Sequence, residues 1–372
     1  NFNVSIGQQA GRTSVDGGGN VLVGYQAGYT NTSGSNNVAI GTTAGYSSTT
    51  SNCTYVGHEA GYTNATGANM TAVGFQALYS STANNNTAFG LYAGLSTTTG
   101  GANTFLGLQS GNNNTTGASN VMVGMQAGYN NTTGSTNTYM GYAAGYGNGA
   151  GTGEGNTAIG FYSQKDKGTS GNYNTSLGFY ALGSDQNAGF TGTGNTSGGY
   201  YSQRFTSSGS YNTTFGYIAG ERLTSGTNNT LIGAEAGTGS APSGQLTSES
   251  NRVCLGNNSV SHLYCKVSTI TTSDRRDKGK FEEIKLGLDF VDKLKPTAFE
   301  FKKDGLRDTE KTDGIKRYGF IAQDILELEG DNPVIINNDR PENLMYSQGN
   351  LIPILVNAIQ ELKAEIEILK NK

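Results

Sequence analysis

The chain has 372 residues and a formal net charge of −4 at neutral pH, and its length predicts two or three domains. Because the charge is negative and no run of Lys and Arg is present, nucleic acid is not expected as a partner. No stretch approaches the roughly 18 apolar residues of a membrane span, and the chain starts at Asn1 without a signal-like segment, so we expect no membrane insertion and a fragment of a longer chain.

Charge divides the chain into two parts. Residues 1–270 hold 7 of the 24 Lys and Arg and 8 of the 28 Asp and Glu, and they hold 50 of the 57 glycines. The remaining residues are densely charged. This step predicts a Gly/Asn/Thr-rich repeat domain over residues 1–260, a junction over residues 261–272 and a second domain over residues 273–372.

The first part repeats around a glycine that recurs mostly every 16 or 17 residues, here called the reference glycine. Position −3 relative to it is always Val or Thr, and position −1 is apolar except at Gly198. Such alternation predicts a short strand with one buried face, formed by positions −3 and −1. The reference glycines are Gly7, Gly24, Gly41, Gly57, Gly74, Gly90, Gly107, Gly124, Gly141, Gly160, Gly178, Gly199, Gly216, Gly233 and Gly256.

Other repeat positions predict close stacking. Position +3 is always Ala or Ser, which indicates a tight contact, and Asn is frequent at position −4, where it can satisfy turn groups or stack on its equivalents. A unit of two short strands and two turns cannot bury its few apolar side chains alone, so the repeats must stack. The composition is typical of disorder, but strict positions through fifteen copies argue against it. We expect a mainly β, β-solenoid or β-roll shaft on the order of 70 Å long.

Aromatic residues recur in register after the reference glycine and after the following Ala-Gly pair. They indicate either a surface on which sugars stack or packing between repeats and chains, and regular recurrence favours packing. Members of these columns include Tyr25, Phe75, Phe161, Phe179 and Tyr200 in the first and Tyr29, Tyr46, Tyr62 and Tyr129 in the second.

The three cysteines, Cys53, Cys254 and Cys265, are odd in number and form no C-x-x-C pair, so neither a disulfide framework nor a metal site is predicted. We interpret them as buried small hydrophobic residues. No motif indicates a cofactor.

The repeats resemble the heads of trimeric autotransporter adhesins. The resemblance is carried by segments such as Asn37–Gly45 (NVAIGTTAG) and covers most of residues 1–260. It implies a left-handed parallel β-roll in a three-chain stack, although the repeat here has a longer period. The stacked solenoid is therefore the firmer expectation, and its handedness stays open.

Residues 273–372 predict a small α+β domain. Helical spacing covers Ile284–Leu294 and Ala322–Leu328, and strands are expected at Thr297–Phe301 and Lys316–Ile321, with two further short strands at Val334–Ile336 and Leu344–Tyr346. The last segment shows a heptad seam with steps of three and four, which predicts a coiled-coil helix with Pro353 in its first turn. The seam residues are Ile352, Leu355, Ile359, Leu362, Ile366 and Leu369.

Three segments of this domain resemble the intramolecular chaperone auto-processing domain of phage tail fibres, tail spikes and endosialidases. Thr272–Lys278 (TSDRRDK) is similar to its S-D-x-R-x-K signature, and Tyr318–Asp324 (YGFIAQD) to its G-F-I-A-Q-E segment, with Asp324 in place of Glu. Ala358–Leu362 (AIQEL) is similar to its terminal coiled coil. Together these segments span nearly all of the last hundred residues in the same order.

The resemblance implies self-cleavage between Thr272 and Ser273, with Ser273 as nucleophile and Lys278 as general base. Asp274 and Arg276 would orient this pair or stabilise developing charge. Lysine acts as a base only when its pKa falls from about 10.4 toward 7–8, through burial or a neighbouring cation. Folding supplies the proximity, which is worth up to roughly 7–11 kcal/mol. The structural alternative is that Ser273 only caps a turn.

The family reading implies a homotrimer, whereas Ile at a and Leu at d by themselves favour a parallel dimer. It predicts a phage tail-fibre or tail-spike segment in the virion, assembled in the host cytoplasm, with a host surface glycan or protein as a possible receptor. One alternative is a bacterial trimeric surface adhesin without peptidase activity. Another is a glycan hydrolase, for which the scattered carboxylates of residues 1–270 offer no pair.

Overall fold

A computed structural model describes residues 2–147, 149–165, 170–183, 189–260, 263, 275, 278–302, 310–338, 341 and 344–371. The chain divides into two compact units, Asn1–Asn257, here called the shaft, and Asn258–Lys372, here called the C-terminal unit. Among the described residues, no helix is long and apolar enough to cross a membrane.

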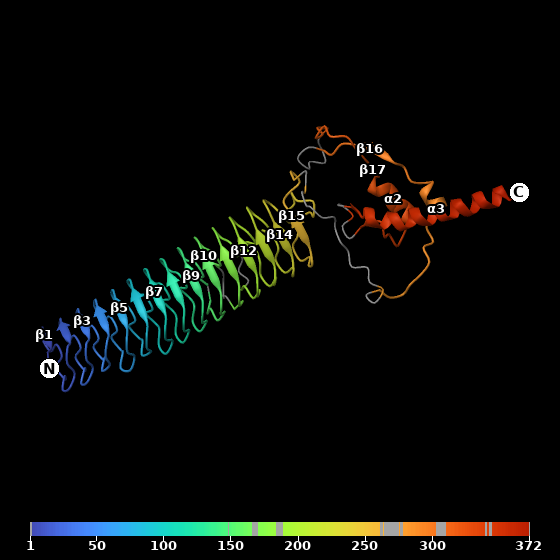
Figure 1. Cartoon of the computed structure of the whole chain (residues 1–372). Helices are drawn as coiled ribbons and strands as arrows, with labels where there is room; N and C mark the ends of the chain where they lie inside the picture. The colour runs from blue at the N-terminus through green and yellow to red at the C-terminus, as the bar shows by residue number, and fades with distance from the viewer. Residues whose placement is uncertain are drawn as a thin grey trace. The chain divides into compact units, whose positions relative to one another are not determined.

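The shaft is one parallel sheet of fifteen strands that follow one another in chain order (Figure 1). Equivalent repeat positions pair directly, as Val4 with Val21 and Thr87 with Thr104, so each repeat forms one rung. The predicted mainly β solenoid is confirmed. The strands are β1 (Val4–Ile6), β2 (Val21–Val23), β3 (Val38–Ile40), β4 (Thr54–Val56), β5 (Thr71–Val73), β6 (Thr87–Phe89), β7 (Thr104–Leu106), β8 (Val121–Val123), β9 (Thr138–Met140), β10 (Thr157–Ile159), β11 (Thr175–Leu177), β12 (Thr196–Gly198), β13 (Thr213–Phe215), β14 (Thr230–Ile232) and β15 (Val253–Leu255).

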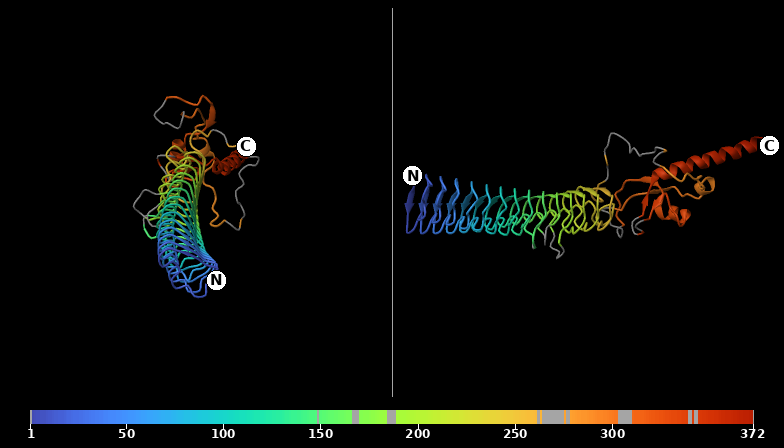
Figure 2. Two further views of the ribbon diagram at one scale, coloured as in Figure 1. Left: turned by 90° about the vertical axis from the view of Figure 1, so that its left-hand side faces the viewer. Right: turned by 90° about the horizontal axis from the view of Figure 1, so that it is seen from below.

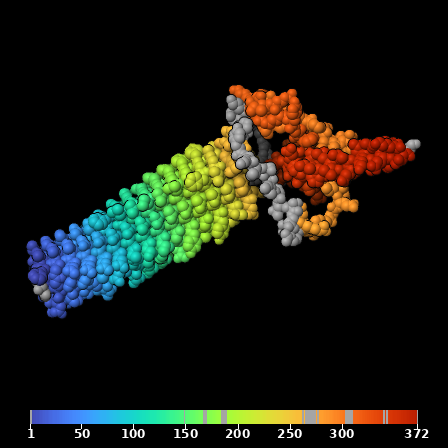
Figure 3. Space-filling model, in the orientation of Figure 1, coloured from blue at the N-terminus to red at the C-terminus, as the bar shows by residue number. Residues whose placement is uncertain are grey.

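Each rung contains one strand of three residues and not the two strands expected from the sequence. The rest of the rung is turn, because backbone groups there bond to the neighbouring rung without extended geometry, as when the Gly28 N–H donates to the Ala44 carbonyl at 2.9 Å. Seen along and across the stack, neighbouring rungs follow one another closely (Figure 2). The space-filling view shows no opening between rungs on the visible side of the shaft (Figure 3).

The predicted orientation of the strand is wrong. The middle residue at position −2 points into the solenoid, whereas positions −3 and −1 are half-buried or exposed, as the pattern of β3 and β7 shows. Both faces of the strand carry apolar side chains, so the period of two could not decide which one packs inside the rung.

In the solenoid core, the sizes of the side chains at positions −2 and +4 compensate for each other. Where position −2 is large, as at Tyr55 or Phe105, position +4 of the same rung and of the preceding rung is glycine, and a Cβ at Gly61 would lie 2.1 Å from the Tyr55 ring. Where position −2 is Ala72, position +4 is the fully buried Leu78. The predicted small residue at +3 is also inside, as Ala27 and Ala44 show. Packing therefore stays tight although the sequence varies.

Asparagine at position −4 forms a buried ladder that runs from rung to rung. Asn120 is typical: its Oδ1 accepts the backbone N–H of Asn137 at 2.9 Å, and its Nδ2 donates to the Gly134 carbonyl at 2.9 Å. Both roles expected for this position are thus filled by one side chain, which satisfies backbone groups that are buried away from water. The ladder is interrupted where Cys53 and Met70 replace Asn.

The reference glycine is required by backbone contact between rungs. At Gly107 the backbone has φ +134°, and an added Cβ would lie 2.6 Å from the carbonyl oxygen of Gly124. Neither the conformation nor the space admits a side chain.

The recurring aromatic residues stack on one another. Tyr46 lies between Tyr29 and Tyr62 with ring centroids 5.0 Å away on each side, and Phe161 stacks on Phe179 at 5.1 Å. Because neighbouring rungs cover both faces of an interior ring, this arrangement favours the packing interpretation over a sugar-stacking surface. Cys53 and Cys254 are buried free thiols, as expected; Cys265 lies outside the described residues.

The C-terminal unit has a small core of its own. It is built from Phe290, Ile325, Ile335, Ile336, Leu351 and Ile354. Its elements are α1 (Leu288–Val291), β16 (Thr297–Phe299), β17 (Arg317–Gly319), α2 (Ala322–Glu329), β18 (Ile336–Asn337), β19 (Met345–Tyr346) and α3 (Gln348–Lys370), with β16–β17 and β18–β19 paired antiparallel.

Two predicted helical features differ in the structure. The helix expected over Ile284–Leu294 shrinks to α1, because the Asn357 amide binds the carbonyls of Ile284 and Leu286 and Gly287 stands at the helix start. Pro353 lies inside α3 and not in its first turn, since α3 begins at Gln348. Without an N–H, Pro353 leaves the carbonyl one turn earlier without its usual partner.

Candidate cleavage junction and chaperone domain

The predicted catalytic residues are only partly described. Thr272, Ser273, Asp274 and Arg276 lie outside the described residues, so the serine–lysine pair stays a prediction. Lys278 is described: its side chain is exposed, and its backbone N–H donates to the Arg275 carbonyl at 3.2 Å. The Arg275 guanidinium lies 4.9 Å from the centroid of the Phe281 ring, so one of the two arginines near Lys278 is held against an aromatic face.

The Tyr318–Asp324 segment forms the junction between β17 and α2. A Cβ on Gly319 would lie 3.1 Å from the Phe299 ring, so glycine lets the two strands and this ring approach. Phe320 turns into the core and meets Tyr346 edge-on at 6.2 Å. Burial there raises the pKa of Tyr346. Asp324 stands in the first turn of α2, where a negative charge is favoured by the helix dipole, as the usual Glu would be.

Glu329 closes the loop that follows α2. Its carboxylate accepts the backbone N–H groups of Val334 and Ile335, each at 2.7 Å, and of Ile336 at 2.9 Å. One side chain therefore satisfies three consecutive backbone donors and starts β18 in the core.

Side chains of the long helix α3 bind backbone groups at the start of α1 and just before it. Glu361 accepts the N–H of Leu288 at 2.6 Å, which caps α1, and Asn357 donates to the Leu286 carbonyl at 3.0 Å. These pairs are 73 and 71 residues apart in the chain. Sequence reasoning missed Glu329, Asn357 and Glu361, since polar residues on a helix look solvated until their distant partners are known.

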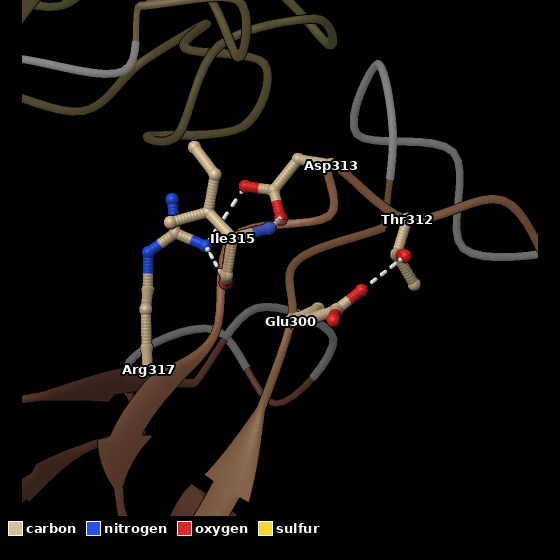
Figure 4. A network of polar contacts seen from close by, with 5 residues as sticks. All are labelled: Glu300, Thr312, Asp313, Ile315 and Arg317. Atoms are coloured by element: carbon tan, nitrogen blue, oxygen red, sulfur yellow. Dashed lines mark hydrogen bonds and ion pairs between the residues drawn. The ribbon is translucent and has the colours of Figure 1, made fainter.

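Polar contacts join the described parts of the connection between β16 and β17 (Figure 4). Asp313 accepts the backbone N–H of Ile315 at 3.0 Å and pairs with Arg317 at 2.8 Å, and Thr312 donates to the Glu300 carboxylate. The Ile315 N–H and then the Arg317 guanidinium hold the pKa of Asp313 below its ordinary value.

Helix α3 presents two apolar faces. Leu351, Ile354 and Ala358 are buried in the domain, whereas the predicted coiled-coil seam lies outside that core. Within the single chain the seam is exposed and Ile352 borders an open groove with Glu283 and Pro353. Its members are Ile352, Leu355, Ile359, Leu362, Ile366 and Leu369, each 37 % exposed or more. An apolar row of this kind is typical of a helix that packs against another helix.

Comparison with known proteins adds one match. Residues 273–332 match the sequence model of the family described as the chaperone of endosialidase. No curated protein and no solved structure matches the chain. The resemblance of the C-terminal part to the intramolecular chaperone domain is thus confirmed, and the repeats before it form a β-solenoid.

Proposed function

We propose that this chain is a segment of a homotrimeric phage tail fibre or tail spike, whose C-terminal unit aligns three chains and then releases itself by self-cleavage. Assembly would take place in the host cytoplasm and the shaft would remain in the virion. A host surface glycan or protein would be the receptor.

The observation that carries the proposal is the position of the family match. It begins at residue 273, the residue that the S-D-x-R-x-K motif designates as the nucleophile, and the Gly/Asn/Thr repeats end shortly before it. A chaperone domain that starts at the proposed cut would leave as one piece.

The proposed reaction needs no group beyond the chain and one water. Ser273 Oγ attacks the carbonyl carbon of Thr272 while Lys278 accepts the hydroxyl proton. The Thr272–Ser273 peptide bond breaks as its nitrogen takes up a proton, and the Thr272 acyl group becomes an ester on Ser273. Water then hydrolyses this ester, which leaves a carboxylate on Thr272 and a free amine on Ser273. Asp274 and Arg276 would position these groups.

Trimer formation is the proposed trigger for this reaction. In the single chain Lys278 is exposed, and so is the seam of α3. Packing of three copies of α3 through the seam would bury its apolar side chains, and the same association would place Lys278 in a drier environment, in which a lysine becomes a better base.

Mass spectrometry of purified full-length chains tests the cut. We expect a C-terminal fragment of residues 273–372 from the natural sequence and none from Ser273→Ala or Lys278→Gln. Ser268→Ala and Lys280→Gln are the matched controls and should still be cut. If trimeric natural protein remains whole, the chain is better described as a surface adhesin without peptidase activity.

A further inference from the structure

One side of the shaft carries apolar side chains and threonines, and no charged side chain, along its fifteen strands. It is formed by positions −3 and −1 of every strand, and this surface is here called the sheet face. No Asp, Glu, Lys or Arg occurs at either position in any repeat. Exposed members at position −1 include Ile6, Ile40, Phe89, Leu106, Met140, Leu177, Phe215, Ile232 and Leu255, all 40 % exposed or more.

The footprint of the sheet face, with the threonines at position −3 included, is comparable to one side of a protein interface. Three strand residues span about 10 Å and fifteen rungs about 70 Å, which gives on the order of 700 Å². The largest apolar patch on a typical monomer is about 300–600 Å², whereas each partner in a stable complex contributes about 800 Å². The sheet face therefore has the area of a protein interface and not of scattered surface residues.

The one break in the apolar column is filled from the next rung. Gly198 lacks a side chain at position −1, and the Phe215 ring lies 2.3 Å from where a Gly198 Cβ would stand. The Phe215 ring covers this gap, so the apolar column at position −1 continues past this rung.

From these observations we propose that the sheet face is the surface through which the shafts of identical chains pack, rung against equivalent rung, in the assembled protein. This inference rests on the proposed homotrimer and names the part of the shaft that it would bury. A partner must offer apolar contacts at the same spacing of about 4.8 Å over about 70 Å. A parallel copy of this chain meets that requirement, since every rung then faces its own equivalent.

The rung structure explains why the interface must form between chains. Each rung already fills its interior with positions −2, +3 and +4, so no space remains for the side chains at −1. Charged residues are excluded from the sheet face because an unpaired charge would be costly in a dry interface. The strict Val or Thr at −3 and apolar residue at −1 thus report contact with another chain.

Methionine oxidation tests the inference in the unmodified full chain. Met140 lies on the sheet face at 42 % exposure and Met345 in the C-terminal unit at 41 %, whereas Met70 and Met122 are fully buried within the chain. After limited peroxide treatment, we expect Met140 to oxidise more than tenfold more slowly in native protein than in unfolded protein, as the buried Met122 should. If Met140 is oxidised less than tenfold more slowly in native protein than in unfolded protein, the inference is overturned.

A charge on the sheet face supplies a second measurement. Leu106→Lys should reduce the trimer fraction by at least tenfold in light scattering, whereas Thr116→Lys on an exposed turn should leave it unchanged. Equal trimer fractions for both variants contradict the inference. Because Leu106 is 47 % exposed in the single chain, the lysine does not disturb the core of its rung.

Cleavage at Thr272–Ser273 is measured in the same samples and separates the two proposals. Protection of Met140 without cleavage would remove the proposed peptidase and retain the interface. Cleavage with an unprotected Met140 would remove the interface alone.

Discussion

The shaft and the C-terminal unit are stabilised in opposite ways. In the shaft, equivalent positions of neighbouring rungs contact one another, and the same Asn, Gly and Ala contacts recur in most of the rungs. In the C-terminal unit, a core of a few residues is supported by single polar contacts between distant segments, such as Glu361 with Leu288.

If the proposed function is correct, this difference divides two tasks between the two units, stacking of the rungs and alignment of the chains. A repeat specifies local stacking well but specifies register poorly, because a chain shifted by one rung makes nearly the same contacts. A domain with unique long-range contacts has only one arrangement. A unit of that kind beside a repeat shaft is therefore suited to setting the register, in agreement with the chaperone family matched by residues 273–332.

The largest effect is expected from a side chain in the column of reference glycines. Gly107→Ala would place a Cβ 2.6 Å from the Gly124 carbonyl at a φ of +134°. Overpacking and backbone strain together should cost about 3 kcal/mol or more. Thermal unfolding followed by the strand signal in circular dichroism should show a clear loss of stability.

Gly239→Ala is the control for this substitution, since no atom lies within 4 Å of its added Cβ. It should leave the melting temperature unchanged. If both alanines had the same effect, close contact between rungs would not be what maintains the glycine column.

The Asn ladder should be the next most sensitive feature. Asn120→Ala removes the acceptor for the Asn137 N–H and the donor for the Gly134 carbonyl, both of which stay buried. The Asn137 N–H is then left unpaired, whereas the Gly134 carbonyl keeps the Asn131 amide at 2.9 Å, and the loss should cost about 2 kcal/mol. Hydrogen exchange of peptides from rungs 8 and 9 should accelerate, while Thr116→Ala on an exposed turn should have no effect. Unchanged exchange would mean that water replaces the amide.

A smaller effect is expected in the C-terminal unit. Glu361→Ala removes the cap of α1 and should destabilise this unit by about 1 kcal/mol, because the contact is partly solvated. The helix signal at 222 nm in the full chain measures it, since α3 is the longest described helix. Glu365→Ala, one turn later on the exposed side of α3, is the matched control. Equal losses for both variants would point to helix propensity and not to the cap.

Sequence reasoning placed the one strand of each rung correctly, although it expected a second strand that the structure does not show in the described rungs. Val or Thr at −3 and an apolar residue at −1 mark the bounds of β3 and of every other shaft strand except β12, which ends at Gly198. It failed to orient them, because position −2 holds Leu22 and Tyr55 where position −1 holds Val23 and Val56, and both faces are apolar. Hydrophobic alternation identifies two faces and not which one another chain covers.

Prediction of the candidate site from the sequence is limited in a different way. The motif around Ser273 can be read from the sequence because it is a short local pattern. The contacts that shape the domain cannot, because Asn357 and Glu361 bind backbone groups more than 70 residues away. No local spacing encodes such a pair, and the Pro353 position in α3 likewise depends on packing that extends the helix toward its start.

The smallest effect is expected at the turn that Asp313 forms with Ile315 before β17. The pKa of Asp313 is lowered by the Ile315 N–H and the Arg317 guanidinium, so the unfolded chain binds a proton at this site more readily than the folded one. The stabilisation is therefore complete above the ordinary Asp pKa of about 3.9 and is lost as the pH falls through the lower folded value.

Hydrogen exchange of a peptide covering residues 313–319, compared with the intrinsic rate at each pH, should show protection of the turn that decreases over this range. Asp313→Asn should show no such step while keeping an acceptor for Ile315. A step of equal size in the variant would assign the pH dependence to another carboxylate. Glu300, which follows β16, would then be examined, because its carboxylate accepts a hydrogen bond from Thr312.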